Sequence, residues 1–144
     1  MARKAEPAPV LYLETSAVLR SVLERGVTAD LARRIERARA LVTSRLSLVE
    51  AARALLRLRA TSAATEPQLA DAARSLDDLW ARCEVWELTP AVCELASRIV
   101  PEQILRTLDA LHIATWLLAR RRLGAVDLLT ADRRIAKAAG VAIM

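Results

Sequence analysis

Four acidic residues, far apart along the chain, are candidates for one shared chemical task. Glu14 ends the apolar segment "VLYLE", Glu50 and Asp109 lie near the starts of helical patterns, and Asp132 follows the apolar segment "AVDLLT". An all-oxygen set of carboxylates is the ligand set that Mg²⁺ and Mn²⁺ prefer in proteins. A metal held in this way lowers the pKa of a bound water and stabilises the oxygens of an in-line phosphoryl displacement. Phosphodiester hydrolysis is therefore the chemistry to expect if the fold brings these acids together.

Each acid also has an ordinary structural role open to it. Glu50 completes "SLVE", which is typical of a capping box with Ser47 as the N-cap. Asp109 lies in the first turn of a predicted helix, where the helix dipole favours a negative charge. Asp132 would serve as the N-cap of the next helix, and Glu14 would precede a Thr or Ser cap. Considered together these roles fit less well, because four like charges in a partly desolvated crevice are costly unless a cation compensates them.

The apolar patterns predict the elements that would position the acids. Strands are expected over the short apolar runs Pro9–Glu14, Ala40–Ser44, Cys83–Leu88, Ala125–Thr130 and Val141–Met144. Helices are expected between them, over Ser16–Arg25, Thr28–Ala38, Ser47–Arg59, Glu66–Arg82, Thr89–Val100, Thr107–Arg122 and Arg133–Ala139. Gly26 and Gly124 end two of these helices, and Thr28 caps another.

Two of the predicted helices carry an apolar stripe that indicates which side they bury. The stripe of the Ser47–Arg59 helix is predicted to consist of Val49, Ala52, Leu55 and Leu56. That of the Glu66–Arg82 helix is predicted to consist of Leu69, Ala73, Leu76 and Trp80.

Strands that alternate with helices predict a parallel sheet with helices on both faces. In such sheets ligands bind outside the carboxyl ends of the strands. Glu14 and Asp132 follow strand ends directly, and Glu50 and Asp109 lie in first helical turns, so we expect all four at one edge of the sheet. Asp127 lies at the beginning of its strand, and we assign it to solvation or an ion pair at the opposite edge.

Composition sets limits on the class of protein. The 144 residues are 54% hydrophobic, which predicts one compact domain over residues 9–144. Residues 1–8 are basic and then Pro-rich, and we expect a disordered lead there. No apolar run approaches the roughly 20 residues that cross a membrane, and no secretory signal is evident, so we expect no membrane partner and a cytoplasmic location.

Several kinds of site are excluded by residue counts. Cys83 and Cys93 lie ten positions apart and fit no zinc spacing; we expect both to be reduced and half-buried. Three scattered glycines cannot build a phosphate-binding or dinucleotide-binding loop. The net charge of +5, carried almost wholly by Arg, is compatible with a nucleic-acid partner or equally with a genomic bias toward Arg codons.

Four segments resemble successive motifs of the PIN-domain ribonucleases, and most closely the VapC-type toxins of bacterial type II toxin–antitoxin pairs. They are "YLETSAVLR", "LSLVEAARAL", "LDALHIATWLLA" and "LLTADRRIAKAA", of which "LDALHIA" and "TADRR" are the more specific pieces. The resemblance implies a three-layer α/β/α sandwich with a central, mainly parallel sheet. It also implies a Mg²⁺- or Mn²⁺-dependent endoribonuclease that forms a homodimer, cuts RNA and is inhibited by a co-encoded antitoxin.

The resemblance assigns roles to the acids by position. Glu14, Glu50, Asp109 and Asp132 would form the catalytic and metal-binding set. Asp109 and Glu14 would bind the metal directly, whereas Asp132 and Glu50 would contribute directly or through water.

Hydroxyl and basic residues near these acids also receive roles from the resemblance. Ser16 and Thr130 would orient carboxylates or water. Arg133 and Arg134 would contact an RNA phosphate or an antitoxin carboxylate, or else lie on a solvated surface. Independently of the resemblance, His112 and Trp116 lie three and seven residues after Asp109 on one helix stripe. They pack in the core or at its rim, or else His112 lines the crevice or Trp116 flanks a base.

One departure from the family pattern leaves alternatives open. The family usually has Asp at the end of the first strand, where this chain has Glu14, whose extra methylene shifts the carboxylate. The crevice would then be wider, Mn²⁺ would be preferred, or catalysis would be weakened and the protein would only bind RNA or an antitoxin. We favour a working site because the other three acids are present. A receiver-like phosphoacceptor or phosphatase fits less well, because the first strand supplies one acid and Lys137 lies within a predicted helix.

Overall fold

The structure is a computed structural model that describes residues 7–24, 29–99 and 105–144. Its strands form one parallel sheet in the order β3-β2-β1-β4. They are β1 Val10–Leu13, β2 Ala40–Ser44, β3 Cys83–Trp86 and β4 Val126–Leu129. Leu13 pairs with Leu129 in register, and the backbone N–H of Glu14 donates to the carbonyl of Leu129 at 3.0 Å. The residues that follow β1 and β4 therefore leave the sheet side by side.

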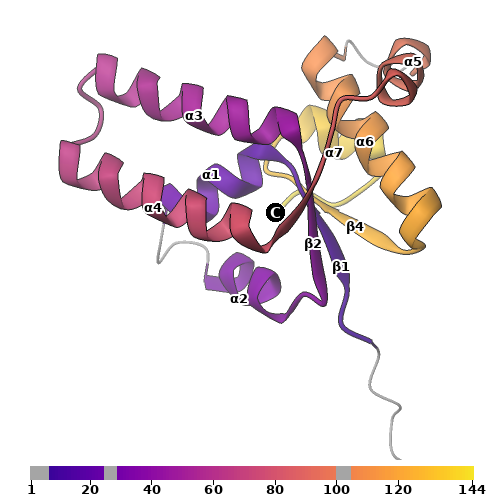
Figure 1. Cartoon of the computed structure of the whole chain (residues 1–144), viewed down its shortest axis with the longest axis horizontal. Helices are drawn as coiled ribbons and strands as arrows, with labels where there is room; N and C mark the ends of the chain where they lie inside the picture. Colours follow the sequence, from indigo (N-terminus) through magenta and orange to yellow (C-terminus); the bar gives the residue numbers. More distant parts are fainter. Residues whose placement is uncertain (1–6, 25–28, 100–104) are drawn as a thin grey trace, which may run out of the picture.

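Helices cover both faces of this sheet (Figure 1). On one face lie α1 Thr15–Leu23, α2 Ala29–Arg37, α3 Arg45–Ala60 and α4 Glu66–Arg82. On the other lie α6 Thr107–Leu123 and α7 Arg133–Ala139, with α5 Pro90–Arg98 packed on α6. The predicted three-layer α/β/α sandwich with a parallel central sheet is confirmed.

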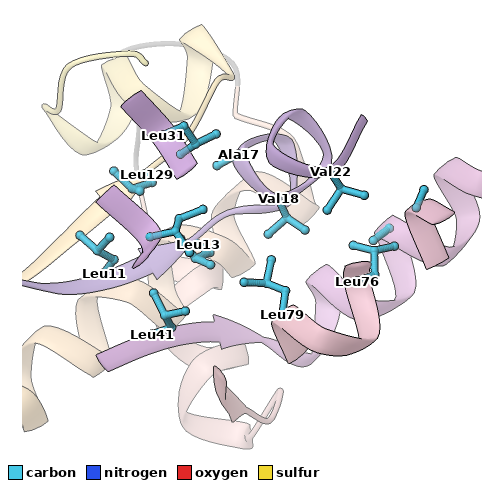
Figure 2. Packing of buried hydrophobic residues seen from close by; sticks show 13 residues of the cluster. Leu11, Leu13, Ala17, Val18, Val22, Leu31, Leu41, Leu76, Leu79 and Leu129 are labelled. Atoms are coloured by element: carbon cyan, nitrogen blue, oxygen red, sulfur yellow. The ribbon is translucent and has the colours of Figure 1, made fainter. Parts of the chain in front are cut away.

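The central strand β1 contributes to both layers of the core. Leu11 and Leu13 pack with α1 and α4, including Val18 (Figure 2). Val10 and Tyr12 point the opposite way, toward α6. Because both faces are covered, the strand is a continuous apolar run rather than an alternating one, and it ends where the first acid begins.

The start of α3 differs from the prediction. The helix begins at Arg45, and the side chain of Ser44 caps it by accepting from the backbone N–H of Leu46 at 3.1 Å. The expected capping box with Ser47 as N-cap is therefore wrong, and Glu50 lies in the second turn. The reason is that Ser44, the last residue of β2, is itself a good cap and starts the helix as soon as the strand ends.

The buried stripe of α3 also differs from the prediction. Its buried residues are Leu46, Ser47, Ala51 and Ala54. Val49 is 55% exposed and Leu56 is 49% exposed, and Ala52 is exposed too. Small side chains thus face α1 and α4, because they allow the helices to approach closely.

Smaller differences concern α4, Cys93 and the C-terminus. α4 buries Ala72 and Leu79 in place of the predicted Ala73 and Trp80, which are half-buried. Cys83 is half-buried as expected, but Cys93 is exposed. Residues 141–144 form no strand. The backbone N–H of Met144 donates a hydrogen bond to the carbonyl of Thr130 at 3.2 Å.

Some expectations fall on parts of the chain that the structure does not describe. The predicted break at Gly26 and the cap at Thr28 lie outside the described residues, as do residues 1–6 of the expected lead. Among the helices of the described residues, none combines the length and apolar character needed to span a bilayer.

Candidate active site

Glu14 is the first residue after β1, and its carboxylate is held toward β4. It occupies the N-cap position of α1 but makes no capping bond with its side chain. It is only 5% exposed. Its Oε2 atom accepts hydrogen bonds from Ser16 Oγ and from Thr130 Oγ1, the latter at 2.8 Å. The two hydroxyls predicted to orient a carboxylate do contact one.

Asp132 is tied to the same pair of hydroxyls. Thr130 Oγ1 accepts from the backbone N–H of Asp132 at 3.0 Å, so this one oxygen atom links Glu14 to Asp132. Ser16 Oγ likewise accepts from the backbone N–H of Ala131 at 2.8 Å. The carboxyl ends of β1 and β4 are thereby joined into one network of hydrogen bonds.

Asp132 also fills the structural role that its position allowed. Its Oδ1 caps α7 by accepting from the backbone N–H of Arg134 at 2.8 Å, and its Oδ2 lies 3.3 Å from the Arg134 guanidinium. Partial burial would raise the pKa of Asp132, but these contacts with Arg134 outweigh it and the pKa is lowered. The carboxylate is therefore ionised at neutral pH.

Glu50 reaches the same edge from the second turn of α3. Its Oε1 accepts from Thr15 Oγ1 at 2.7 Å and lies 2.6 Å from Nε2 of His112. Burial would raise the pKa of Glu50, but the hydrogen bonds from His112 and Thr15 lower it overall. Thr15 is the residue after Glu14, so its bond to Glu50 brings the two glutamates to the same part of the molecule.

His112 and Thr15 are site residues that the sequence pattern did not identify. His112 is 1% exposed and is backed by Tyr12, whose hydroxyl lies 3.0 Å from Nδ1. Its spacing of three residues from Asp109 predicts that it lies on the same side of the helix, but core packing was the favoured interpretation. No sequence motif indicated a site role for Thr15, apart from its position directly after Glu14.

Asp109 lies in the first turn of α6 and is 9% exposed. Its Oδ2 is buried and, within the part of the chain that the structure describes, accepts no hydrogen bond. The charge of Asp109 acts on Arg134, which is paired with Asp132. The pKa of Arg134 is raised chiefly by its hydrogen bond with Asp132 and to a smaller extent by the charge of Asp109. A buried carboxylate oxygen without a donor is costly, so this atom is suited to a cation.

Hydrogen bonds thus connect the surroundings of Glu14, Asp132 and Glu50, but the four acids do not form a closed metal cage. Among the described residues, no three His, Cys, Asp or Glu side chains converge closely enough to hold an ion. Mg²⁺ usually keeps several waters and is bound through only one or two carboxylates. The chemistry of these residues, carboxylates with one orphaned oxygen on Asp109, therefore fits a hydrated divalent cation with fewer direct protein ligands than four.

Three other residues singled out from the sequence lie at less central positions. Asp127 is exposed on β4, as expected. Trp116 belongs to the core, where its Nε1 donates to the carbonyl of Val126 at 2.9 Å. Arg133 is exposed at the start of α7.

Comparison with known proteins identifies the family. The family model for the PIN domain matches residues 11–141. The chain belongs to the PIN-domain family. The predicted resemblance to VapC-type proteins is confirmed as well, because the chain is 33% identical to Ribonuclease VapC45 of Mycobacterium tuberculosis over 110 residues, 76% of each protein.

Solved structures share the fold of this PIN domain. It is similar to a structure of VapBC2 from Rickettsia felis bound to a DNA fragment from its promoter, with a TM-score of 0.63, 13% identity and coverage of 94% of this chain and 97% of that one. It is also similar to a toxin–antitoxin complex from Klebsiella pneumoniae, with a TM-score of 0.62, 16% identity and coverage of 92% and 95%.

Proposed function

We propose that this PIN-domain protein is a Mg²⁺- or Mn²⁺-dependent endoribonuclease that acts as the toxin of a toxin–antitoxin pair. The observation that carries the proposal is the buried Oδ2 of Asp109, which no donor among the described residues reaches. The hydrogen bonds that connect the surroundings of the other three candidate acids support it. The identity to a protein named as a ribonuclease supports the same activity.

The residues divide the work according to their contacts. Asp109 and Glu14 would hold the cation directly, and Asp132 and Glu50 would hold it directly or through water. When bound, the cation supplies an activated water and neutralises charge on the phosphate that is cleaved. Ser16 and Thr130 keep Glu14 oriented by holding its Oε2.

Basic residues beside the acids would orient the substrate. Arg134 neutralises Asp132 and lies within electrostatic reach of Asp109. Arg133 is exposed next to it. Either guanidinium can donate to an RNA phosphate, which the acids alone would repel.

The proposal is tested by Asp109→Asn, assayed for cleavage of RNA with Mg²⁺ or Mn²⁺. We expect the natural protein to cut RNA and EDTA to stop the cleavage. Removing a hydrogen-bond partner of a metal ligand costs roughly 10–100-fold in activity. Because Asp109 would itself be a ligand, the variant should lose more cleavage activity than that. Asp127→Asn is the matched control, because this aspartate is exposed at the far end of β4, and it should leave cleavage unchanged. Activity that persists in Asp109→Asn would defeat the assignment.

A second candidate is a PIN domain that still binds RNA or an antitoxin but cleaves weakly. The observation that favours it is that Glu14, in place of the usual Asp, already has two hydroxyl donors on its Oε2. A carboxylate held in this way has only Oε1 left for a cation. Comparison with Glu14→Asp distinguishes the two candidates.

We further propose that the protein forms a homodimer in the cytoplasm and is bound there by a cognate antitoxin. The support is the likeness to structures whose titles describe VapBC2 and a toxin–antitoxin complex. Coexpression with the product of a neighbouring small reading frame, followed by light scattering, tests this. A monomeric mass that does not change on coexpression would contradict it.

A further inference from the structure

A line of hydrogen bonds runs from the centre of the sheet to the acidic edge. The hydroxyl of Tyr12, on β1, lies 3.0 Å from Nδ1 of His112 on α6. Nε2 of His112 lies 2.6 Å from Oε1 of Glu50 on α3. Tyr12 and His112 are fully buried, whereas the side chain of Glu50 is 27% exposed. Three elements from both helical layers and the sheet are therefore connected through one imidazole.

The chemistry of the two neighbours fixes the proton on this imidazole. The Tyr12 hydroxyl, 3.0 Å from Nδ1, can donate its proton to that nitrogen. The carboxylate of Glu50, 2.6 Å from Nε2, offers an acceptor on the other side of the ring. Nε2 is then the nitrogen that carries the proton shared with Glu50.

The contacts on Glu50 are unequal between its two oxygens. His112 Nε2 and Thr15 Oγ1 both reach Oε1, and these two donors lie 3.2 Å from each other. Among the described residues, no side-chain donor reaches Oε2. Fixing one oxygen in this way limits rotation of the carboxylate and leaves the second oxygen free in a defined direction.

We propose that His112, fixed by Tyr12, is a positioning residue for Glu50: it binds Oε1 so that Oε2 remains free for a divalent cation or for the water it carries. The inference rests on the proposed function of the acidic edge. Outer hydrogen bonds to a metal-binding carboxylate orient it, and their loss costs about 10–100-fold in metal affinity or activity. A histidine that only filled the core would have no such effect.

The test is Mn²⁺ binding, measured by calorimetry with the metal alone on tag-free protein. His112→Leu removes the donor to Glu50 and should weaken binding by about 10–100-fold. His112→Gln keeps an N–H group near the position of Nε2 and should recover much of this loss. Trp116→Phe is the matched control, because it removes a buried hydrogen bond from the same helix without touching the acids, and it should bind Mn²⁺ normally.

A milder variant and a second measurement do not depend on the folding of His112→Leu. Tyr12→Phe keeps the shape of the ring while removing the donor to Nδ1, and it should weaken Mn²⁺ binding less than His112→Leu. The chain has one His and one Tyr, so the imidazole ¹⁵N signals in an NMR spectrum belong to His112 alone. We expect Nε2 to be protonated in the natural protein, and a bare Nε2 would overturn the proposal.

The outcomes separate this inference from the proposed function. If Asp109→Asn abolishes Mn²⁺ binding while His112→Leu and Tyr12→Phe bind normally, the positioning role is wrong and the nuclease proposal stands. Equal losses in Trp116→Phe and His112→Leu would also overturn the positioning role, because the effect would then be general damage to α6. If the natural protein binds no Mn²⁺ and cuts no RNA, both proposals fail.

Discussion

Glu14 stands where the family resemblance leads us to expect aspartate, and its longer side chain has specific contacts. Its Oε2 reaches the hydroxyl of Thr130 at 2.8 Å, across the pair of strands. Ser16, two residues later, holds the same oxygen. The carboxylate is therefore held between a donor just after β4 and one in α1, which keeps it in one place.

The first prediction at this scale concerns Glu14→Asp. If the site works as built, the shorter side chain will lose its contact with Thr130, and kcat/KM for RNA cleavage should fall by about 10–100-fold, as expected for a displaced catalytic group. The same conservative change at Glu94, which is exposed and paired with Arg98 on α5, should have no effect. A large gain of cleavage in Glu14→Asp would instead show that the natural protein has a weakened site.

Residue types and strand ends predict that the four acids share an edge, but they do not indicate which side chains hold each acid. Asp132 carries out both roles that the sequence left open, since it caps α7 and lies beside Thr130. The partner of Glu50 is His112, 62 positions away. Such pairs depend on the relative placement of α3 and α6, about which local patterns carry no information.

At the scale of elements, the order of the four observed strands and the helices was predictable, and β1 and β2 are short, mainly apolar runs. The same kind of pattern wrongly predicted a strand over residues 141–144. The bounds of β2, α4 and α7 agree with the prediction. The failure at α3 has a physical cause. This helix has apolar residues on two sides, so periodicity alone could not tell which side faces the core.

The choice of side on α3 can be tested with two neighbouring alanines. Ala51 is fully buried and Ala52 is exposed. Ala51→Leu should destabilise the protein by about 1–3 kcal/mol through overpacking, whereas Ala52→Leu should change the free energy of unfolding by less than about 0.5 kcal/mol. Urea denaturation measures both. The reverse order would mean that the stripe with Val49 and Leu56 is the one that packs.

At the scale of the whole molecule, the acidic residues of the candidate site contrast with the charge of the rest of the chain. The chain as a whole is positive, with a net charge of +5, which favours approach of a polyanion such as RNA. The edge that holds Glu14, Glu50, Asp109 and Asp132 is the exception. A phosphate would be repelled there unless a divalent ion and Arg134 offset the carboxylates.

This arrangement predicts that Asp109 destabilises the metal-free protein. The change in the free energy of unfolding caused by Asp109→Asn measures this effect. A carboxylate at the first turn of α6 gains about 0.3–1 kcal/mol from the helix dipole, but a buried polar group without a partner costs about 1–3 kcal/mol. The second effect is larger, so in EDTA the variant should melt higher than the natural protein, by about 2–4 °C for each kcal/mol gained. Mn²⁺ should raise the melting temperature of the natural protein by mass action and leave that of the variant unchanged. If the variant melts lower in EDTA, the dipole dominates and the unpartnered Oδ2 carries no penalty for a cation to relieve.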